Sequence, residues 1–361
     1  MTARWPTIAL ASSLLLASCQ PPSPTPHVTA VLNPFHLLLH AKGSVALRKP
    51  AWTAYSPISF GAAIAAEDLV RIGAGASITV ACADLSILTL SDSAPAPLPC
   101  PDGDALVVHP RELLMRGAVV HDCPALLFPR AGNLRDPRPE IRWAAIEATR
   151  DYKVALDAGA FHWERDTQIG PGASEGRLPY PAGEAPLPLD GEAAIVISGA
   201  LHSSRACSPQ RSVVHRLSAQ EQAAVERAEL RLQTPQLSPT EVEFLRANLW
   251  VSHEMYSDAI ALLERLARKP GAPREAVERL LGECYEAIEL PERAAEAYRA
   301  ALAESQSQAA SDLEAQAALN LGLARVSEQA DESRSRMLTA SELYRRLGDT
   351  KRADDLAHPG S

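Results

Sequence analysis

The sequence predicts a multidomain β + α fold, in which two small antiparallel β modules precede an α-helical solenoid of repeats. Most prolines and glycines lie before His215, where short apolar stretches alternate with period two. From His215 onward, 147 residues carry 18 basic and 25 acidic side chains, against 17 and 19 in the preceding 214. Helical spacing of apolar residues begins at the same point, which marks the change from β to α structure.

Residues 1–18 predict a signal peptide. Arg4 is followed by the apolar stretch Ile8–Ala17, which is shorter than the roughly twenty residues a membrane-spanning helix needs. It has the length of the apolar core of a signal peptide. Leu16-Ala17-Ser18-Cys19 resembles a bacterial lipobox. The resemblance implies that Cys19 becomes the first residue, with a diacylglycerol on its sulfur and a further acyl chain such as palmitate on its amino group. An ordinary signal peptide with a chance cysteine is the alternative.

Residues 19–33 predict a proline-rich extended tether between the lipid and the folded chain. Two or three acyl chains give lasting membrane anchorage, whereas one gives only marginal binding. The resemblance therefore implies a cell-envelope lipoprotein that faces the periplasm. By similarity to enterobacterial sorting, Gln20 after the cysteine favours the outer membrane over the inner membrane. The sequence does not settle the membrane or the leaflet.

Residues 34–124 predict the first β module. Strands are expected at 45–47, 58–60, 69–72, 77–82 and 85–90. Their spacing by Gly and Pro is typical of a sandwich or barrel. The stretch Gly43–Val80, with Trp52 and the turn Glu67–Gly73, resembles a FecR domain. Full-length FecR regulators have a cytoplasmic sigma-binding segment and a membrane span, which are not found here. The resemblance therefore implies an envelope module and no signalling to a sigma factor.

Residues 125–205 predict the second β module. A tryptophan, Trp143, precedes a strand that carries Tyr152, Val154 and Leu156 at alternate positions. This arrangement resembles a fibronectin type III sandwich. Because residues i, i+2 and i+4 of a strand share one face, we expect these aromatic and aliphatic side chains to form a core. A ligand platform made by the aromatic side chains is the less favoured alternative.

Residues 215–361 predict helices. Ser218–Glu221 and Ser238–Glu241 have the sequence of capping boxes, and Pro239 would occupy the first helical position of the second. The region after them resembles tetratricopeptide repeats. Three copies carry the resemblance: Ala247, Trp250, Tyr256, Ala259, Leu263 and Leu266; Leu281, Gly282, Tyr285, Ala294, Tyr298, Ala301 and Leu302; and Leu321, Gly322, Tyr344, Gly348 and Asp349. The resemblance implies stacked helical hairpins whose small residues allow close approach.

The cysteines predict one disulfide. With Cys19 acylated, five cysteines remain in a compartment that permits disulfides. Cys82 ends a predicted strand and Cys100 lies eighteen residues further on, so we expect these two to pair. A bridge between Cys123 and Cys207 is a weaker expectation, and all of them being reduced is the alternative. Cys284 is expected to be a buried thiol in a repeat helix.

Other groups of polar residues predict no site. His36 and His40 have a spacing that would chelate a metal on a helix, but no third ligand is near, and ordinary histidines are favoured. His121-Asp122-Cys123 has the residue types of a catalytic trio, yet strand neighbours point to opposite faces. Glu164-Arg165-Asp166 is expected to be a solvated charged turn. A further stripe is expected to be a solvated helix face rather than a site for a basic partner: Glu283, Glu286, Glu289, Glu292 and Glu296.

These patterns favour a non-catalytic envelope lipoprotein that recruits another envelope protein through its repeats. The sequence lacks the common motifs of metalloproteases, serine hydrolases and nucleotide-binding loops, and we expect no catalytic residue, metal or cofactor. A net charge of −9 argues against nucleic-acid binding. The alternative is binding of cell-wall carbohydrate or peptidoglycan by the β modules, for which Trp52, Trp143 or Trp163 would have to be exposed. The partner, its binding residues and the oligomeric state are not predicted.

Overall fold

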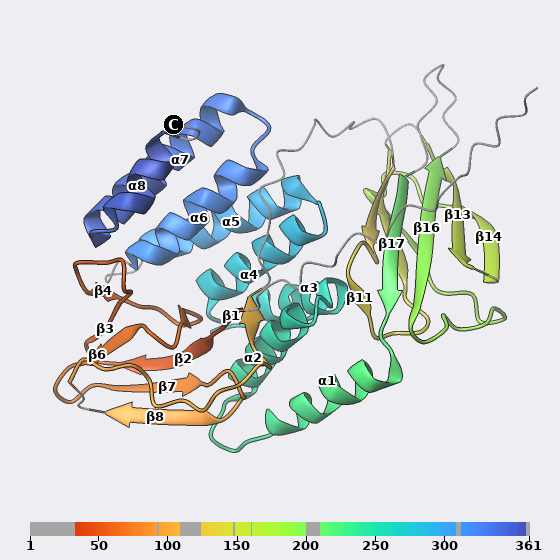
Figure 1. The fold of residues 1–361 in the computed structure, drawn as a ribbon. Coiled ribbons are helices and arrows are strands. Elements are labelled where there is room, and N and C mark those ends of the chain that lie inside the picture. The colour runs from red at the N-terminus through yellow and green to blue at the C-terminus, as the bar shows by residue number, and fades with distance from the viewer. Residues whose placement is uncertain are drawn as a thin grey trace, which may run out of the picture. The chain divides into compact units, whose positions relative to one another are not determined.

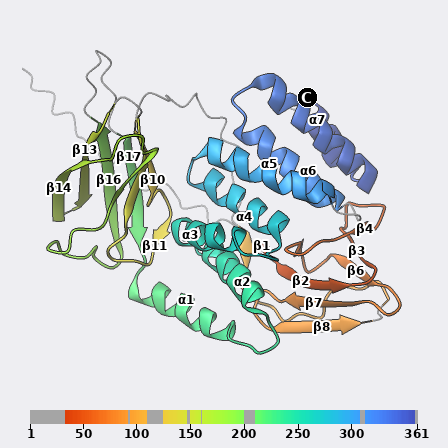
Figure 2. The ribbon, with the colours of Figure 1, turned by 180° about the vertical axis from the view of Figure 1, so that it is seen from behind.

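The computed structural model describes residues 33–91, 94–108, 124–146, 149–159, 161–199, 210–307 and 312–358. In these ranges the chain forms several small sheets followed by the helices α1 to α8 (Figures 1 and 2). The strand pairs are antiparallel except β11 with β17, which pair parallel. The predicted order of small antiparallel sheets and then helices is confirmed, and no sheet closes into a barrel within these ranges.

The first β module consists of two sheets and a short strand pair. The four-stranded sheet has the order β5 (Ala63–Ile64), β2 (His36–Lys42), β7 (Ser77–Ala81) and β8 (Ile87–Ser91). The three-stranded sheet has the order β4 (Ser56–Pro57), β3 (Val45–Arg48) and β6 (Leu69–Ile72), and β1 (Asn33–Pro34) pairs with β9 (Val107–Val108). The strand expected at 58–60 lies slightly earlier, at β4. Apolar side chains of both sheets, among them Leu38, Leu47 and Ile78, form one buried cluster.

The first half of strand β2 is buried on both faces, which explains the apolar run Leu37–Leu39, whereas His40 to Lys42 are exposed. Leu38 belongs to the core of the module. Leu37 and Leu39 point the other way and join a cluster that contains Phe244 of the helical region. A strand covered on one face alternates polar and apolar residues, whereas a strand covered on both faces does not. The segment from Phe35 to Leu39 is covered on both faces and therefore shows no alternation. The helices therefore cover the outer face of this strand.

The second β module also consists of two sheets. The smaller has the order β10 (Ala125–Phe128), β12 (Ile141–Ala144) and β15 (Glu175–Leu178). The larger has the order β11 (Asn133–Leu134), β17 (Gln210–Arg216), β16 (Gly191–Gly199), β13 (Asp151–Ala158) and β14 (Phe161–Gln168). Strand β17 lies after residue 205, where the sequence analysis ended this module, because its pairing with β16 extends the sheet to Arg216.

The predicted core of this module is present. Trp143, Tyr152, Val154 and Leu156 are all buried and share one cluster. Trp143 pairs with Gly176 across β12 and β15. A Cβ atom at Gly176 would lie 2.0 Å from the Trp143 ring, so only glycine leaves room for the indole. The aromatic cluster is therefore core packing rather than a ligand platform.

The helical region consists of helices that follow one another at short intervals. Their bounds are α1 (Ala219–Arg231), α2 (Pro239–Ser252), α3 (Tyr256–Ala267), α4 (Arg274–Ala287), α5 (Pro291–Ser307), α6 (Leu313–Val326), α7 (Ala330–Leu347) and α8 (Thr350–Ala357). Both predicted capping boxes are formed, by Ser218 with Glu221 and by Ser238 with Glu241. Within the described ranges, each helix is too short or too polar to cross a bilayer.

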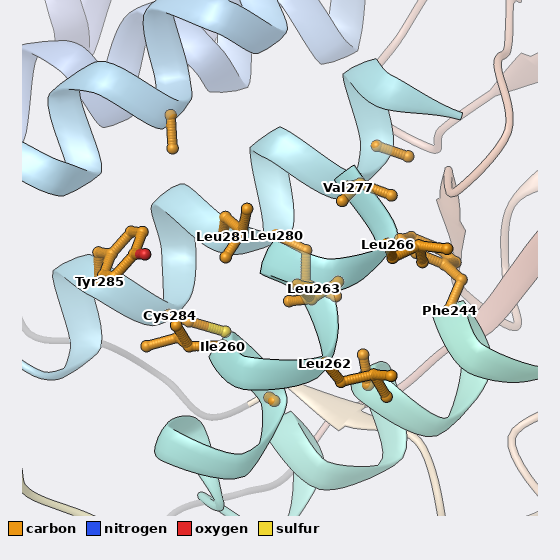
Figure 3. Close-up of a cluster of buried hydrophobic side chains, with 14 of the residues drawn as sticks. Phe244, Ile260, Leu262, Leu263, Leu266, Val277, Leu280, Leu281, Cys284 and Tyr285 are labelled. Carbon is orange, nitrogen blue, oxygen red and sulfur yellow. The ribbon is translucent and has the colours of Figure 1, made fainter. Parts of the chain in front are cut away.

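Consecutive helices pack against each other along the chain from α2 to α8. Side chains of α2, α3 and α4 gather in one buried cluster that includes Phe244, Leu263 and Leu281 (Figure 3). Cys284 lies in the same cluster and is fully buried, as predicted. Apolar burial of this kind supplies most of the stability of short helices.

Tyr298 of α5 is held between two glycines on neighbouring helices. A Cβ atom at Gly282 of α4 would lie 2.5 Å from one edge of its ring, and one at Gly322 of α6 would lie 2.7 Å from the other. The Tyr298 hydroxyl donates a hydrogen bond of 2.7 Å to Glu286 Oε2. Since real side-chain contacts are longer, α4, α5 and α6 can approach this closely only with glycine at both positions.

We predict that Gly322→Ala destabilises the protein by about 1–3 kcal/mol through overpacking against Tyr298. The sign of this change in stability is informative, because replacing glycine by alanine at a solvent-exposed position inside a helix stabilises the helix by about 1 kcal/mol. Gly170→Ala is the control, since no atom lies within 4 Å of the added Cβ. Chemical denaturation of both variants measures the difference. A Gly322→Ala protein as stable as the unchanged chain would contradict this packing.

Candidate functional site: an arginine-lined cavity

A polar cavity of about 550 Å³ lies between the smaller sheet of the second β module and helices α3 and α4. Arginine and glutamate side chains dominate its wall. The lining residues are Arg142, Glu175, Arg177, Glu264, Ala267, Arg268, Arg274, Glu278 and Leu281. The structure thus brings together charged residues that lie more than a hundred positions apart in the chain.

The sheet side of the cavity follows from strand alternation. Trp143 of β12 points into the core and is fully buried, so its neighbour Arg142 points to the opposite face. Arg142 pairs in register with Arg177 of β15, which places two cations opposite each other. Glu175 lies two residues before Arg177 and therefore on the same face, where it accepts from Arg142 at 2.9 Å and lies 3.8 Å from Arg177.

The helix side of the cavity comes from the end of α3 and the length of α4. Glu264 and Arg268 are four residues apart, and Arg268 is the C-cap of α3. Arg274, Glu278 and Leu281 are spaced at four and three residues on α4, so they share one face of that helix. The two helices present this face to the sheet.

Two of the lining glutamates belong to an ion-pair network. Glu175 accepts hydrogen bonds from Arg142 and from Arg293 of α5. Glu264 accepts a hydrogen bond of 2.7 Å from the Tyr285 hydroxyl and lies 4.0 Å from both guanidinium groups. Burial acts to raise the pKa of Glu175, but the hydrogen bonds from the two arginines outweigh it and hold the pKa below its usual value. Glu175 is therefore ionised and bound to cations.

Two other arginines of the wall have no such partner. Arg268 and Arg274 are exposed and form no ion pair with any residue in the described ranges. Burial raises the pKa of the Glu278 carboxyl, and the nearby Arg274 opposes this shift. The lining holds four arginines and three glutamates, and two of those glutamates are already engaged in the ion-pair network, so the wall has a small excess of positive charge. Guanidinium groups hold carboxylate and phosphate oxygens through paired hydrogen bonds, so this cavity suits an anionic ligand.

The polar groups of the wall are guanidinium and carboxylate groups. The lining contains no serine, threonine, cysteine or histidine. None of these arginines lies in a recognisable motif of the sequence. The available signal was the predominance of arginine among the basic residues, but which arginines meet depends on contacts between the sheet and the helices.

The predicted disulfide pair is bonded in the structure. Cys82 and Cys100 are joined, with their Cα atoms 5.5 Å apart. His36 lies beside them, but its Nδ1 accepts a hydrogen bond of 3.1 Å from the Ala83 amide, and burial lowers its pKa. Because both sulfurs are in the disulfide, this group offers no thiolate to a metal. His36 and His40 lie on strand β2 and not on a helix, and His40 is exposed.

Several predicted residues lie elsewhere. Glu164, Arg165 and Asp166 lie within strand β14 and not in a turn, because their backbone pairs antiparallel with β13; Lys153 of β13 also forms an ion pair with Glu164 at 2.6 Å. The acidic stripe is not one helix face: Glu283 and Glu286 lie in α4, Glu289 has a φ of 64° in the following turn, and Glu292 and Glu296 lie in α5. Cys19, His121, Asp122, Cys123 and Cys207 lie outside the described residues.

The tryptophans named for carbohydrate binding are buried. Trp52 is 4% exposed, Trp143 is 0% and Trp163 is 3%. Trp143 and Trp163 belong to the core of the second β module, and Trp52 packs against α7 residues Tyr344 and Leu347. None of these indole rings presents a face on which a sugar ring could stack.

Comparison with known proteins assigns no family. Neither the protein-family models nor the curated proteins give a match. Among solved structures, the native conformation of alpha-2-macroglobulin from E. coli is 12% identical, with a TM-score of 0.18 over 78% of this chain and 23% of that one. Salmonella alpha-2-macroglobulin reacted with methylamine is 10% identical, with a TM-score of 0.20 over 84% and 25%. The chain thus covers about a quarter of either protein, and similarities this low carry no functional argument.

Asp258 is a buried carboxyl in the first turn of α3, the helix that ends at the cavity. Burial raises its pKa to about 6, although the Arg135 backbone amide donates a hydrogen bond to it and opposes the shift. Its Oδ2 atom is buried without a hydrogen-bond partner among the described residues. In the unfolded chain the same carboxyl has a pKa near 3.8. The folded protein therefore binds a proton more tightly than the unfolded chain.

We predict that the protein becomes more stable relative to Asp258→Asn as the pH falls from 7 to 4.5. Between pH 6 and 4 the folded state holds one more proton than the unfolded chain, so its free energy of unfolding rises as the pH falls. The expected change is on the order of 1–3 kcal/mol. Denaturant unfolding at pH 7 and 4.5 measures it, with Asp331→Asn in the exposed first turn of α7 as the control. Identical pH dependence of the two variants would contradict this.

Proposed function

We propose that this chain is a non-catalytic, lipid-anchored envelope protein that acts as an interaction scaffold and binds an acidic segment of a partner protein in the arginine-lined cavity. The observation that supports this most strongly is the pair Arg268 and Arg274. They line a cavity of about 550 Å³ and form no ion pair in the described ranges, although the carboxyl of Glu278 is a Coulombic neighbour of Arg274. A segment rich in Asp and Glu would supply the missing carboxylates.

The proposed scaffold is a tetratricopeptide-type array. Its hairpins would be α2 with α3, α4 with α5, and α6 with α7. Three features support this assignment: Ala259 and Ala294 are fully buried near the start of the second helix of their hairpins, Gly282 and Gly322 lie in the first helix of theirs, and Tyr298 fills the space between those glycines. Stacked hairpins present an extended surface suited to peptide segments.

The two β modules are proposed as the FecR-like and fibronectin type III-like parts of the same scaffold. Each has two sheets around its own buried cluster, antiparallel except for the β11–β17 pair of the second module, which is compatible with both resemblances. The second module has a direct part in binding, because Arg142 and Arg177 line the cavity. The first module covers α2 through Leu37 and Leu39.

The proposed location is the cell envelope, with the chain anchored through lipid at Cys19. The lipobox-like sequence before Cys19 and the proline-rich residues 19–33 support this. A disulfide at Cys82 and Cys100 is compatible with an oxidising compartment. The carbohydrate-binding alternative is less favoured, because Trp52, Trp143 and Trp163 are buried.

We predict that Cys19→Ser releases the full-length chain from the membrane fraction, because the sulfur that would carry the diacylglycerol is removed. Fractionation and metabolic labelling with a radioactive fatty acid measure the change. Cys284→Ser is the control, since that thiol is buried in α4 and far from the lipobox in the sequence. If Cys19→Ser stays in the membrane fraction with unchanged labelling, the proposed anchor is wrong.

We also predict that the double variant Arg268→Glu, Arg274→Glu binds an acidic peptide at least tenfold more weakly than the unchanged chain, a difference of about 1.4 kcal/mol. The probe is a fluorescent hexaglutamate peptide, titrated into the full-length protein by anisotropy at low and at physiological salt. Binding should weaken with salt, because the exposed charges are screened.

The matched control is the double variant Arg227→Glu, Arg265→Glu. Both arginines are exposed and lie outside the cavity wall, in α1 and α3. This variant has the same net charge as the cavity variant. A general electrostatic attraction would weaken equally in both, whereas a site in the cavity is lost only in the first. Equal affinity of the two double variants for hexaglutamate would refute the cavity as the binding site.

A further inference from the structure

Three potential metal ligands from separate elements meet where the second β module leads into α1. They are Asp190 in the turn before β16, His215 near the end of β17 and Glu221 in the first turn of α1. One ligand atom of each lies within 4.8 Å of the others, and His215 Nε2 is 3.7 Å from Asp190 Oδ1. The separation of 3.7 Å is too long for a hydrogen bond and lies within the range of an ion pair when the imidazole is protonated.

The backbone holds these three residues together. In the β16–β17 ladder Gly191 pairs with Arg216 and Glu192 with His215, which brings the turn at Asp190 alongside the end of β17. Only Leu217 and Ser218 separate β17 from α1, whose capping box begins at Ser218. The convergence therefore follows from regular sheet pairing and a fixed helix start.

The capping box also orients Glu221. Its Oε2 atom accepts hydrogen bonds from the Ser218 amide at 2.9 Å and the Ser218 hydroxyl at 2.8 Å. These bonds hold the pKa of the Glu221 carboxyl below its usual value, so the group is ionised at neutral pH. Its Oε1 atom has no hydrogen bond from the described part of the chain and is available as a ligand. A carboxylate fixed through one oxygen by hydrogen bonds is the usual arrangement of a metal ligand.

The donor set is one imidazole nitrogen and two carboxylate oxygens. Zn²⁺ binds such groups at about 2.0–2.2 Å, which places tetrahedral ligands about 3.3 Å apart. The His215–Asp190 separation of 3.7 Å is close to that spacing, and the ligand atom of Glu221 lies within 4.8 Å of both. An imidazole ligand favours a transition metal over Ca²⁺ or Mg²⁺, which prefer oxygen alone.

We propose that Asp190, His215 and Glu221 bind a divalent transition metal, with Zn²⁺ as the probe and water completing the coordination. The ion would join α1 to the β16–β17 pair and so restrain the connection between the sheet and the helical region. The three side chains are partly or largely exposed, so the site is open to solvent and can exchange its metal. This proposal does not depend on the function proposed for the arginine-lined cavity.

The test uses the full-length protein in detergent after removal of metals by a chelator. Zn²⁺ affinity is measured by competition with a chromophoric chelator, and Co²⁺ absorption reports the coordination. His215→Gln, Asp190→Asn and Glu221→Gln each remove one ligand with little change in shape. Asn tolerates the φ of 52° at position 190, and Gln also completes a capping box, so these variants keep the local fold.

We expect one equivalent of Zn²⁺ in the unchanged chain and an affinity at least about tenfold lower in each ligand variant. Zn²⁺ should also raise the melting temperature of the unchanged chain, because a ligand of the folded state stabilises it. His162→Gln is the control, since this exposed histidine lies on β14 away from the cluster. The proposal is overturned if the unchanged chain binds no stoichiometric Zn²⁺, or if His162→Gln loses as much affinity as the three ligand variants.

Discussion

The pairing of one carboxylate with two arginines holds the second β module against the helices. Glu175 of β15 accepts from Arg142 of the adjacent strand and from Arg293 of α5. Arg142 and Arg177 face each other across the ladder, an arrangement that is unfavourable without an anion between them. If Glu175 were removed, the half-buried cations would lose their partner, and breaking such a pair costs far more than forming it gains. Beside this network, Leu127 and Phe128 of β10 pack into the buried cluster of the helices, so polar and apolar contacts together keep the sheet next to α3 to α5.

A second polar contact fixes the first β module in a similar way. Asp312 caps α6 by accepting from the Ala315 amide at 2.9 Å, and its other oxygen accepts from the amide and the hydroxyl of Ser59, each at 3.0 Å. Arg279 of α4 donates to the Gly61 carbonyl at 2.7 Å and pairs with the buried Glu275. Directional bonds of this kind specify one orientation, whereas the apolar contacts of Leu37 and Leu39 supply area without direction.

Features that depend on neighbours in the chain were predictable from the sequence. The capping boxes at Ser218 and Ser238, the inward face of Tyr152, Val154 and Leu156, and the pairing of Cys82 with Cys100 all follow from local spacing. Features that depend on contacts between modules were not. The first half of strand β2 shows no alternation of polar and apolar residues because both of its faces are buried. The charged residues at Glu164 resemble a turn in the sequence, although they form a strand that pairs with β13. The cavity arginines come from three distant segments, and no local pattern reveals their convergence.

The charge of the whole chain sharpens what the cavity can select. The protein carries a net charge of −9, which opposes the approach of an acidic partner, and like charges facing each other at an interface cost several kcal/mol. In the proposed complex, the attraction of the Arg268 and Arg274 guanidinium groups for carboxylate oxygens would act against this overall repulsion. Repulsion elsewhere and attraction at one place together define specificity. A strongly basic protein would lack the first of these effects, and an acidic protein without this arginine pair would lack the second.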